Sequence, residues 1–192
     1  PLADAQVAAI PNRLGVDFGP SMDSGQDGVM RLLGHDLETG MVEPGGQVAV
    51  TLYWQALAPA DRDYTVFVHL LGEGELIVAQ RDTYPGLGLL STTRLTPGDT
   101  WADRYVLRVP NTAYAPDQAQ IEVGVYDAAS GDRLQVFQDG QPLPGVDARG
   151  VGDPVGRADG LDGRAVVVGD AEQGLAPLHH VNHAVLVRRR CA

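Results

Sequence analysis

The sequence predicts an all-β protein: an antiparallel immunoglobulin-like or jelly-roll-like β-sandwich with long loops. Apolar and polar residues alternate in short runs, which is the period of a half-buried strand. Turn-forming residues separate these runs, and the 192 residues include 24 Gly and 13 Pro. Helical periodicity is nearly absent, and the runs do not alternate with helices as a βαβ fold requires.

The first half of the chain contains the clearest strand patterns. In 47–55 (QVAVTLYWQ), the larger apolar side chains fall on one face, and 64–71 (YTVFVHLL) repeats this alternation. EPGG at 43–46 and GEG at 72–74 are turn sequences, because Pro fixes φ and Gly accepts a positive φ. The strands expected here are 30–37, 47–55, 64–71 and 75–81.

The second half continues the pattern after a long connection. Residues 82–98 show little alternation, and such a segment is either a binding loop or a crossover between the two sheets. Residues 123–127 and 132–136 flank a four-residue turn and predict a hairpin. The strands expected here are 101–109, 121–127, 134–137, 164–168 and 184–187.

These patterns divide the chain into four parts of one domain. Residues 1–28 are expected to form an N-terminal arm and a first edge strand, and 29–137 the sandwich core. Residues 138–163 are a Gly/Asp/Pro-rich excursion, and 164–192 supply closing strands and a tail. Because the chain begins with Pro, we expect it to be a processed or excised part of a longer protein.

Charge and composition exclude several functions. The net charge is −11 and every basic residue other than His is Arg, so the surface is expected to repel phosphate backbones and anionic lipids. This argues against nucleic acid as a partner. The sequence has no apolar stretch of the roughly 18 residues that a membrane span needs, so direct membrane insertion by this segment is not expected. Cys191 is the single cysteine and cannot form an internal disulfide, and no cofactor is expected.

The region between residues 29 and 137 carries an ordered run of residues that matches a known family of domains. Its pieces are RLLG at 31–34, VTLYWQAL at 50–57, DYTVFVHLL at 63–71, VAQ at 78–80 and VGVYD at 123–127. This run resembles the soluble β-sandwich domain at the C-terminal end of bacterial membrane glycosyltransferases of the dolichyl-phosphate-mannose–protein mannosyltransferase type, found in Chloroflexi-like bacteria. The chain departs from the family where Ser91-Thr92 and Leu95 replace a Pro-Thr pair and a Trp.

The resemblance implies a non-catalytic accessory domain on the extracytoplasmic face of the cytoplasmic membrane. Its partner would be the membrane-embedded catalytic portion of the same polypeptide, and the loop at 82–98 would contact a glycan or acceptor. The family brings no catalytic residues to this segment, because its transferase chemistry belongs to the membrane portion. We therefore expect no enzyme activity from this chain.

Four residues are candidates for ligand binding. Tyr84 lies beside Pro85 in the long connection, where its ring either stacks on the apolar face of a sugar or anchors the loop. Asp82 and Arg81 are close enough in sequence to supply hydrogen bonds to such a sugar. Trp101 is the fourth candidate, although its phase within 101–109 favours a position at the edge of the core. Trp54 is interpreted as a core residue between the sheets.

The histidines around residue 180 offer a different function. His179 and His183 share a face on either a helix or a strand, so they are candidate metal ligands of a small metal-dependent hydrolase. Zinc would need at least one more ligand, and no Glu lies inside the cluster to act as a base. A protein–protein interaction module that pairs through an exposed sheet edge is a further alternative.

The remaining polar candidates have simpler interpretations. His69 lies within a strand and is expected to be a structural histidine bonded across the sheet. The acidic residues of the turns are expected to be solvated carboxylates rather than a catalytic pair or calcium ligands. The pairs concerned are Asp61/Asp63, Asp99/Asp103 and Asp159/Asp162.

Overall fold

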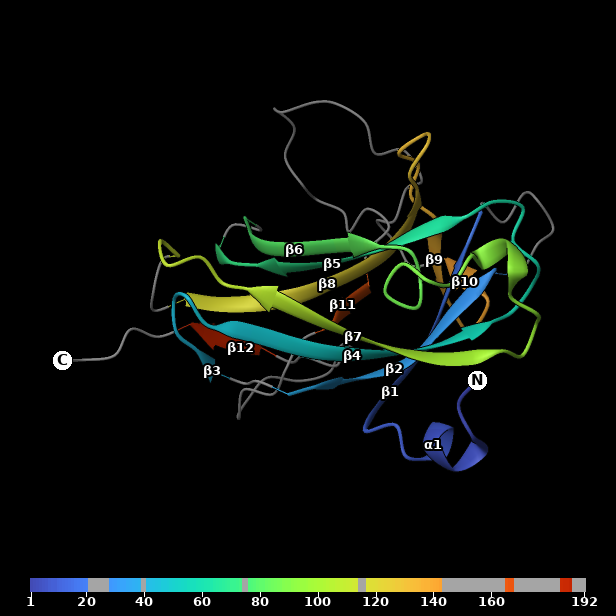
Figure 1. Ribbon diagram of the computed structural model, residues 1–192, viewed down its shortest axis with the longest axis horizontal. Coiled ribbons are helices and arrows are strands. Elements are labelled where there is room, and N and C mark those ends of the chain that lie inside the picture. Colours follow the sequence, from blue (N-terminus) through green and yellow to red (C-terminus); the bar gives the residue numbers. More distant parts are fainter. Residues whose placement is uncertain are drawn as a thin grey trace.

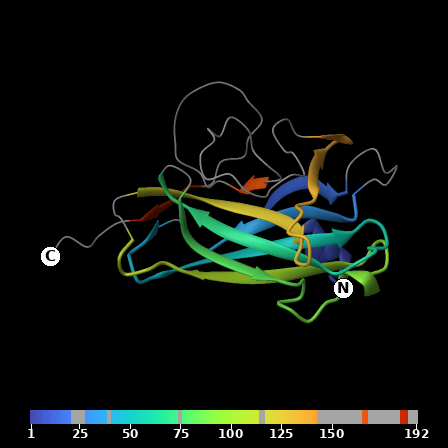
Figure 2. The same ribbon diagram turned by 90° about the horizontal axis from the view of Figure 1, so that it is seen from above.

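The computed structural model describes residues 1–20, 28–38, 41–73, 76–113 and 117–142, together with the backbone of 165–167 and 184–187. Over these residues, two sheets face each other, and α1 (Asp4–Ala8) lies outside the pair (Figure 1). The longest strands, in cyan, teal and yellow, run along the long axis of the molecule (Figure 2). The predicted antiparallel β-sandwich is confirmed.

Each sheet collects strands from distant parts of the chain. The first has the order β10 (Gln141–Pro142), β9 (Gln135–Gln138), β1 (Asn12–Gly19), β2 (Met30–Leu37), β4 (Gln47–Ala56), β7 (Thr100–Arg108). The second has the order β3 (Met41–Val42), β12 (Ala184–Val187), β8 (Asp117–Asp127), β5 (Tyr64–Leu71), β6 (Ile77–Thr83), and β11 (Ala165–Val167) also pairs with β8. All pairs are antiparallel except β3–β12.

Strand positions follow the alternation closely, but the topology differs from the prediction in two places. β1 is not an edge strand, because it pairs with β2 on one side and β9 on the other. The predicted hairpin ends soon after its turn. The Leu134 amide donates to the Val125 carbonyl at 2.8 Å, and the chain then crosses to the first sheet, where Val136 pairs with Phe18.

Trp54 lies at the centre of the core, as predicted. It is fully buried, its ring stacks on Trp101 with centroids 6.4 Å apart, and Phe18 packs against it at 5.7 Å. Trp54 and Trp101 face each other in the β4–β7 register, so the stack joins neighbouring strands of one sheet. Burial of such large aromatic side chains contributes much of the stability of a sandwich.

The segment between β6 and β7 is a crossover. β6 is the outermost strand of the second sheet and β7 the outermost strand of the first. The connection therefore passes over the open side of the sandwich and includes the short 3-10 helix η3 (Thr92–Arg94). Its first part, Tyr84 to Leu90, is called the Tyr84 loop below.

Candidate functional site

The outer face of the second sheet carries polar and aromatic side chains. Val66, Val68 and Leu70 of β5 belong to the core, so the alternate residues Phe67 and His69 face away from it. Yet all eight residues of β5 are buried, which shows that this outer face is also covered. The residues that meet there are called the outer-face cluster: Phe67, His69, Asp82, Glu122, Tyr126 and Arg133.

His69 is the centre of the outer-face cluster. Its Nδ1 lies 2.9 Å from Oε2 of Glu122 on β8, and its Nε2 lies 3.6 Å from Oδ1 of Asp82 on β6. The ring stacks on Phe67 with centroids 4.7 Å apart. Only 7% of His69 is exposed. The expected cross-sheet histidine is confirmed, and it connects three strands.

Arg133 balances the buried charge of Glu122. Its Nη1 lies 3.7 Å from Oε1 of Glu122, whose side chain is 3% exposed. The guanidinium carbon also lies 4.6 Å from the centre of the Phe67 ring, a cation–π contact. A buried carboxylate is costly without such partners, so Arg133 and His69 together make the position of Glu122 tolerable.

Asp82 lies between the buried histidine and the surface. The Tyr126 hydroxyl donates to its Oδ2 at 3.2 Å, while Oδ1 faces His69. Burial raises the pKa of Tyr126, and the negative charge of Asp82 raises it further. The Asp82 side chain is 32% exposed and Tyr84 is 42% exposed. Tyr84 directly follows the end of β6, so an accessible aromatic ring comes two residues after this carboxylate along the chain.

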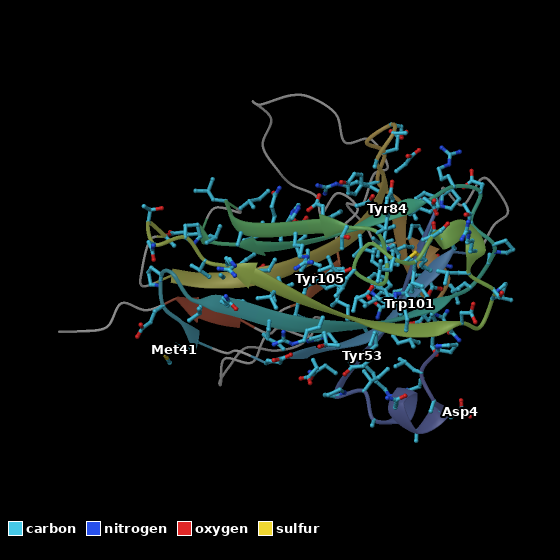
Figure 3. The ribbon with its side chains drawn as sticks, viewed as in Figure 1. Asp4, Met41, Tyr53, Tyr84, Trp101 and Tyr105 are labelled. Atoms are coloured by element: carbon cyan, nitrogen blue, oxygen red, sulfur yellow. The ribbon has the colours of Figure 1, made fainter. Side chains whose placement is uncertain are left out.

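The four predicted ligand residues do not share one surface. Asp82 lies on the outer side of the second sheet, opposite Phe67, and Tyr84 follows the end of β6 two residues later. Arg81 is opposite Val68 in the register, so it leaves β6 on the other face and cannot join them. Trp101 is 7% exposed, and its ring is stacked in the core, where it offers no open face to a sugar (Figure 3).

The Tyr84 loop is tightly closed. The Gly88 amide donates to the Tyr84 carbonyl at 2.7 Å, and the Leu90 amide donates to the Pro85 carbonyl at 2.8 Å. Leu87 and Leu89 are 43% and 88% exposed. The loop therefore combines an ordered backbone with an exposed, largely apolar tip beside Tyr84.

Asp103 lies beneath this loop and corrects a prediction. The sequence suggests a solvated carboxylate, but Asp103 is 2% exposed and shares the core-facing side of β7 with Trp101. Its Oδ2 accepts the Gly86 amide at 3.0 Å and the Trp101 indole N–H at 3.1 Å. Burial raises the pKa of Asp103, and these two hydrogen bonds oppose the increase.

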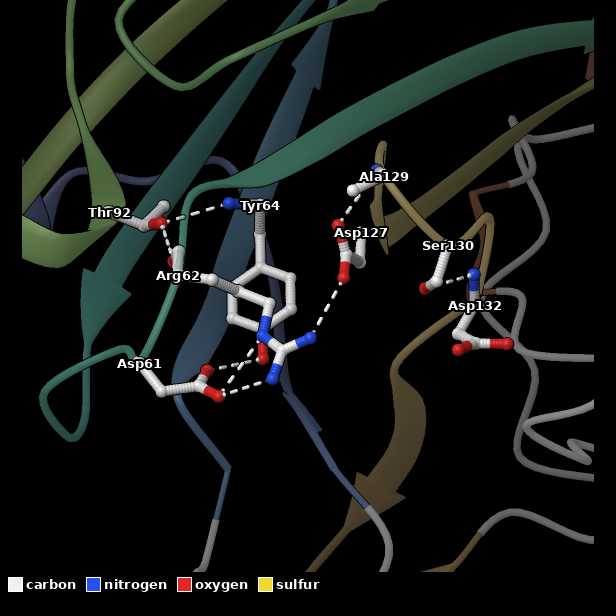
Figure 4. Close-up of polar contacts among 8 residues, drawn as sticks. All are labelled: Asp61, Arg62, Tyr64, Thr92, Asp127, Ala129, Ser130 and Asp132. Atoms are coloured by element: carbon white, nitrogen blue, oxygen red, sulfur yellow. Dashed lines mark hydrogen bonds and ion pairs between the residues drawn. The ribbon is translucent and has the colours of Figure 1, made fainter.

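A second polar cluster ties three loops together at one corner of the sandwich (Figure 4). Arg62 contacts Asp61 at 2.7 Å and Asp127 at 2.9 Å, and the Tyr64 hydroxyl donates to Asp61 at 2.9 Å. The Thr92 hydroxyl donates to the Arg62 carbonyl at 2.8 Å and accepts the Tyr64 amide at 2.9 Å. These carboxylates are occupied by loop contacts, so the corner is structural.

The predicted metal ligands His179 and His183 lie outside the described residues, as do Asp159 and Asp162. In the parts of the chain that are described, no group of three or more His, Cys, Asp or Glu side chains is arranged to hold a metal ion. Within the same parts, no helix has the length and apolar character needed to cross a membrane.

Three important residues of the outer-face cluster were not among the sequence candidates: Glu122, Tyr126 and Arg133. Glu122 and Tyr126 occupy the polar phase of β8, between the core residues Ile121, Val123 and Val125. That alternation predicts that they face outward. The missing information was the pairing of β8 with β5, which brings them beside Phe67 and His69.

Comparisons with known proteins give only distant similarities. No family model matches the chain, and no curated protein matches its sequence. Solved structures with a similar shape include a β-glucuronidase of glycoside hydrolase family 2, with a TM-score of 0.41 and 10% identity over 54% of this chain. The Bacteroides uniformis β-glucuronidase has a TM-score of 0.39 and 10% identity, also over 54% of this chain. The C-terminal domain of wzt is similar over 74% of this chain and 80% of its own, with TM-score 0.42 and 11% identity. The chain spans only 10% and 12% of the two glucuronidases, so a functional assignment has to come from its own side chains.

Proposed function

We propose that this chain is a non-catalytic accessory domain that binds a glycan at Tyr84 and Asp82. The observation that carries the proposal is an exposed Tyr84 ring two residues along the chain from Asp82, a carboxylate that contacts His69 and Tyr126. An aromatic ring packs against the apolar face of a sugar, and a carboxylate accepts hydrogen bonds from neighbouring hydroxyls. Because Asp82 is already fixed, little side-chain entropy is lost when a ligand binds.

The outer-face cluster is better suited to binding than to catalysis. A histidine that activates a nucleophile needs one ring nitrogen directed at that nucleophile and the other at an orienting group. Both ring nitrogens of His69 face carboxylates instead, Glu122 and Asp82. The histidine therefore lies against Asp82, which also accepts a hydrogen bond from the Tyr126 hydroxyl.

The charge of the site indicates which glycans it takes. The Asp82 side chain is 32% exposed, the buried Glu122 contacts the other side of the His69 ring, and the whole chain has a net charge of −11. An anionic sugar would meet electrostatic repulsion there. Neutral sugars are the preferred ligand class of this proposal, and uronic acid oligomers are excluded by it.

The cellular setting is proposed from the family resemblance. In this proposal the domain lies on the extracytoplasmic face of the cytoplasmic membrane and is attached to the membrane-embedded part of a glycosyltransferase. The support is the ordered run from residue 29 to 137, which includes Asp82, Tyr126 and the corner residues Asp61 and Asp127. Sequencing the complete gene tests this setting, because several membrane spans should precede residue 1.

Binding is tested by titration calorimetry of the purified chain with mannotriose as a neutral probe, chitotriose as an N-acetylated probe and trigalacturonate as an anionic probe. We expect mannotriose or chitotriose to bind and trigalacturonate not to bind. If all three fail with a sample whose amide protection shows it to be folded, the glycan proposal is wrong. Preference for trigalacturonate would contradict the charge argument.

A second candidate function has one observation in its favour. β6 is an outermost strand; Leu76, just before it, is 71% exposed, and Ile77, its first residue, is 52% exposed. An exposed edge of this kind can pair with another strand. Analytical ultracentrifugation tests self-association through this edge: a dimer that Ile77→Lys abolishes supports it, and a monomer at all concentrations argues against it.

A further inference from the structure

The Tyr84 loop has an unfavourable backbone conformation. Three consecutive residues, Gly86, Leu87 and Gly88, have φ values of 64°, 55° and 95°. Glycine adopts such values easily, but Leu87 does so only at a steric cost. A backbone of this kind persists only where surrounding contacts hold it.

Asp103 supplies the contact that holds this segment from the core side. The Gly86 amide, at the start of the left-handed stretch, donates to its Oδ2 at 3.0 Å. The same oxygen accepts the Trp101 indole N–H at 3.1 Å, and Trp101 is itself fixed by stacking on Trp54. The carboxylate thus links the loop to the stacked tryptophans of the core.

The placement of this carboxylate has no explanation in core packing alone. An ionised group that is 2% exposed loses hydration, and among the described residues no cation forms an ion pair with Asp103. The other titratable groups that act on this buried region are Arg81 from β6 and Tyr105 from β7. An apolar residue at position 103 would cost less to bury. The hydrogen bond from the Gly86 amide therefore explains the carboxylate better than core packing does.

We propose that Asp103 is a positioning residue that holds the Tyr84 loop in the conformation that leaves the Tyr84 ring exposed, two residues after Asp82. Its role in ligand binding rests on the proposed function; its hold on the loop does not. The carboxylate acts through the Gly86 amide, and Trp101 orients the carboxylate. This also gives Trp101 a part in the site without contact to the ligand.

Hydrogen–deuterium exchange of the Gly86 amide tests its hydrogen bond to Asp103 directly, with no ligand present. Asp103→Leu removes the acceptor, so we expect Gly86 exchange to rise at least about tenfold while the β2 and β4 amides stay protected. Asp103→Asn keeps an acceptor of the same shape, and exchange should stay within about threefold of the wild type. Equal Gly86 exchange in all three proteins overturns the proposal.

The wild-type protein provides a second test that does not depend on the folding of a variant. A protonated carboxyl is a weaker acceptor than a carboxylate. Gly86 exchange, corrected for its intrinsic pH dependence, should therefore rise as the pH falls through the Asp103 titration, and Asp103→Asn should show no such step. A flat corrected profile in the wild type counts against the proposal.

Titration with mannotriose separates the two proposals. If the wild type binds, Asp103→Leu should weaken the affinity at least about tenfold, and Asp103→Asn should restore it to within about threefold. Unchanged affinity in Asp103→Leu overturns the link between Asp103 and the ligand. If the wild type binds none of the three sugar probes, the glycan proposal fails, and the Gly86 exchange still decides the role of Asp103.

Discussion

Nδ1 of His69 lies 2.9 Å from Oε2 of Glu122, across the β5–β8 pair and on the face of the sheet turned away from the core. Both residues are buried, at 7% and 3% exposure. This contact orients the imidazole, so that its other nitrogen faces Asp82, two residues before the exposed Tyr84. The buried pair thereby connects the interior of the outer-face cluster to the proposed glycan site.

Glu122→Ala is predicted to destabilise the protein by about 3 kcal/mol, because removing one member of a buried ionic network leaves the others without compensation. His69 and Arg133 would lose their carboxylate partner. The free energy of unfolding from urea titration measures the effect. Gln120→Ala is the matched control two residues earlier in β8, where the side chain is exposed, and its effect should be within about 0.5 kcal/mol.

Asp103→Asn is predicted to raise the melting temperature at neutral pH. Burial raises the pKa of Asp103 in the folded protein, so the folded state holds its proton more tightly than the unfolded state. Its contribution to stability is therefore most favourable at acidic pH and is lost as the pH rises through the folded pKa. Calorimetric melting curves should show a gain for Asp103→Asn at pH 7 that shrinks toward acidic pH.

Asp63→Asn is predicted to have the opposite pH dependence. A hydrogen bond from the Ser91 hydroxyl lowers the pKa of Asp63, so its contribution is present at neutral pH and is lost on acidification through the folded pKa. The variant should melt below the wild type at pH 7 and converge with it in acid. Identical pH profiles for Asp63→Asn and Asp103→Asn would contradict both assignments.

Two substitutions in the Tyr84 loop are predicted to differ in sign. Leu87→Gly removes a side chain from a left-handed position and should leave the free energy of unfolding unchanged or raise it by up to about 1 kcal/mol. Gly86→Ala places a Cβ against Leu90 at a positive φ and should lower it by about 1–3 kcal/mol. Urea titration of both variants measures the difference, and a larger loss for Leu87→Gly would show that the loop is not held as described.

Local alternation was enough to predict most of the fold. Strands 30–37 and 64–71 were placed to the residue, because each has a buried face with a period of two. The same rule could not show that β5 is buried on both faces, since that depends on what covers the sheet. It also could not show that β9 leaves β8 for β1, because only two sheets packed together decide where a strand pairs.

The candidate site was predictable only in part. Tyr84 and Asp82 were chosen because an aromatic residue in a long connection is hard to explain by core packing; the structure shows Tyr84 exposed, and their role in binding stays a prediction. Arg81 was misplaced because one step along a strand reverses the face. The burial of Asp103 depends on the Gly86 amide, which reaches it from another part of the chain, and no local pattern contains that contact.

The most direct test of glycan binding at Tyr84 is titration of two variants of the same loop with mannotriose and chitotriose. Tyr84→Ala removes the proposed stacking ring, and Leu89→Ala removes an even more exposed side chain with no assigned role. The account predicts at least about tenfold weaker binding for Tyr84→Ala, equivalent to about 1.4 kcal/mol, and less than about twofold change for Leu89→Ala. Equal effects of the two substitutions, or no effect of Tyr84→Ala on sugar binding, would contradict it.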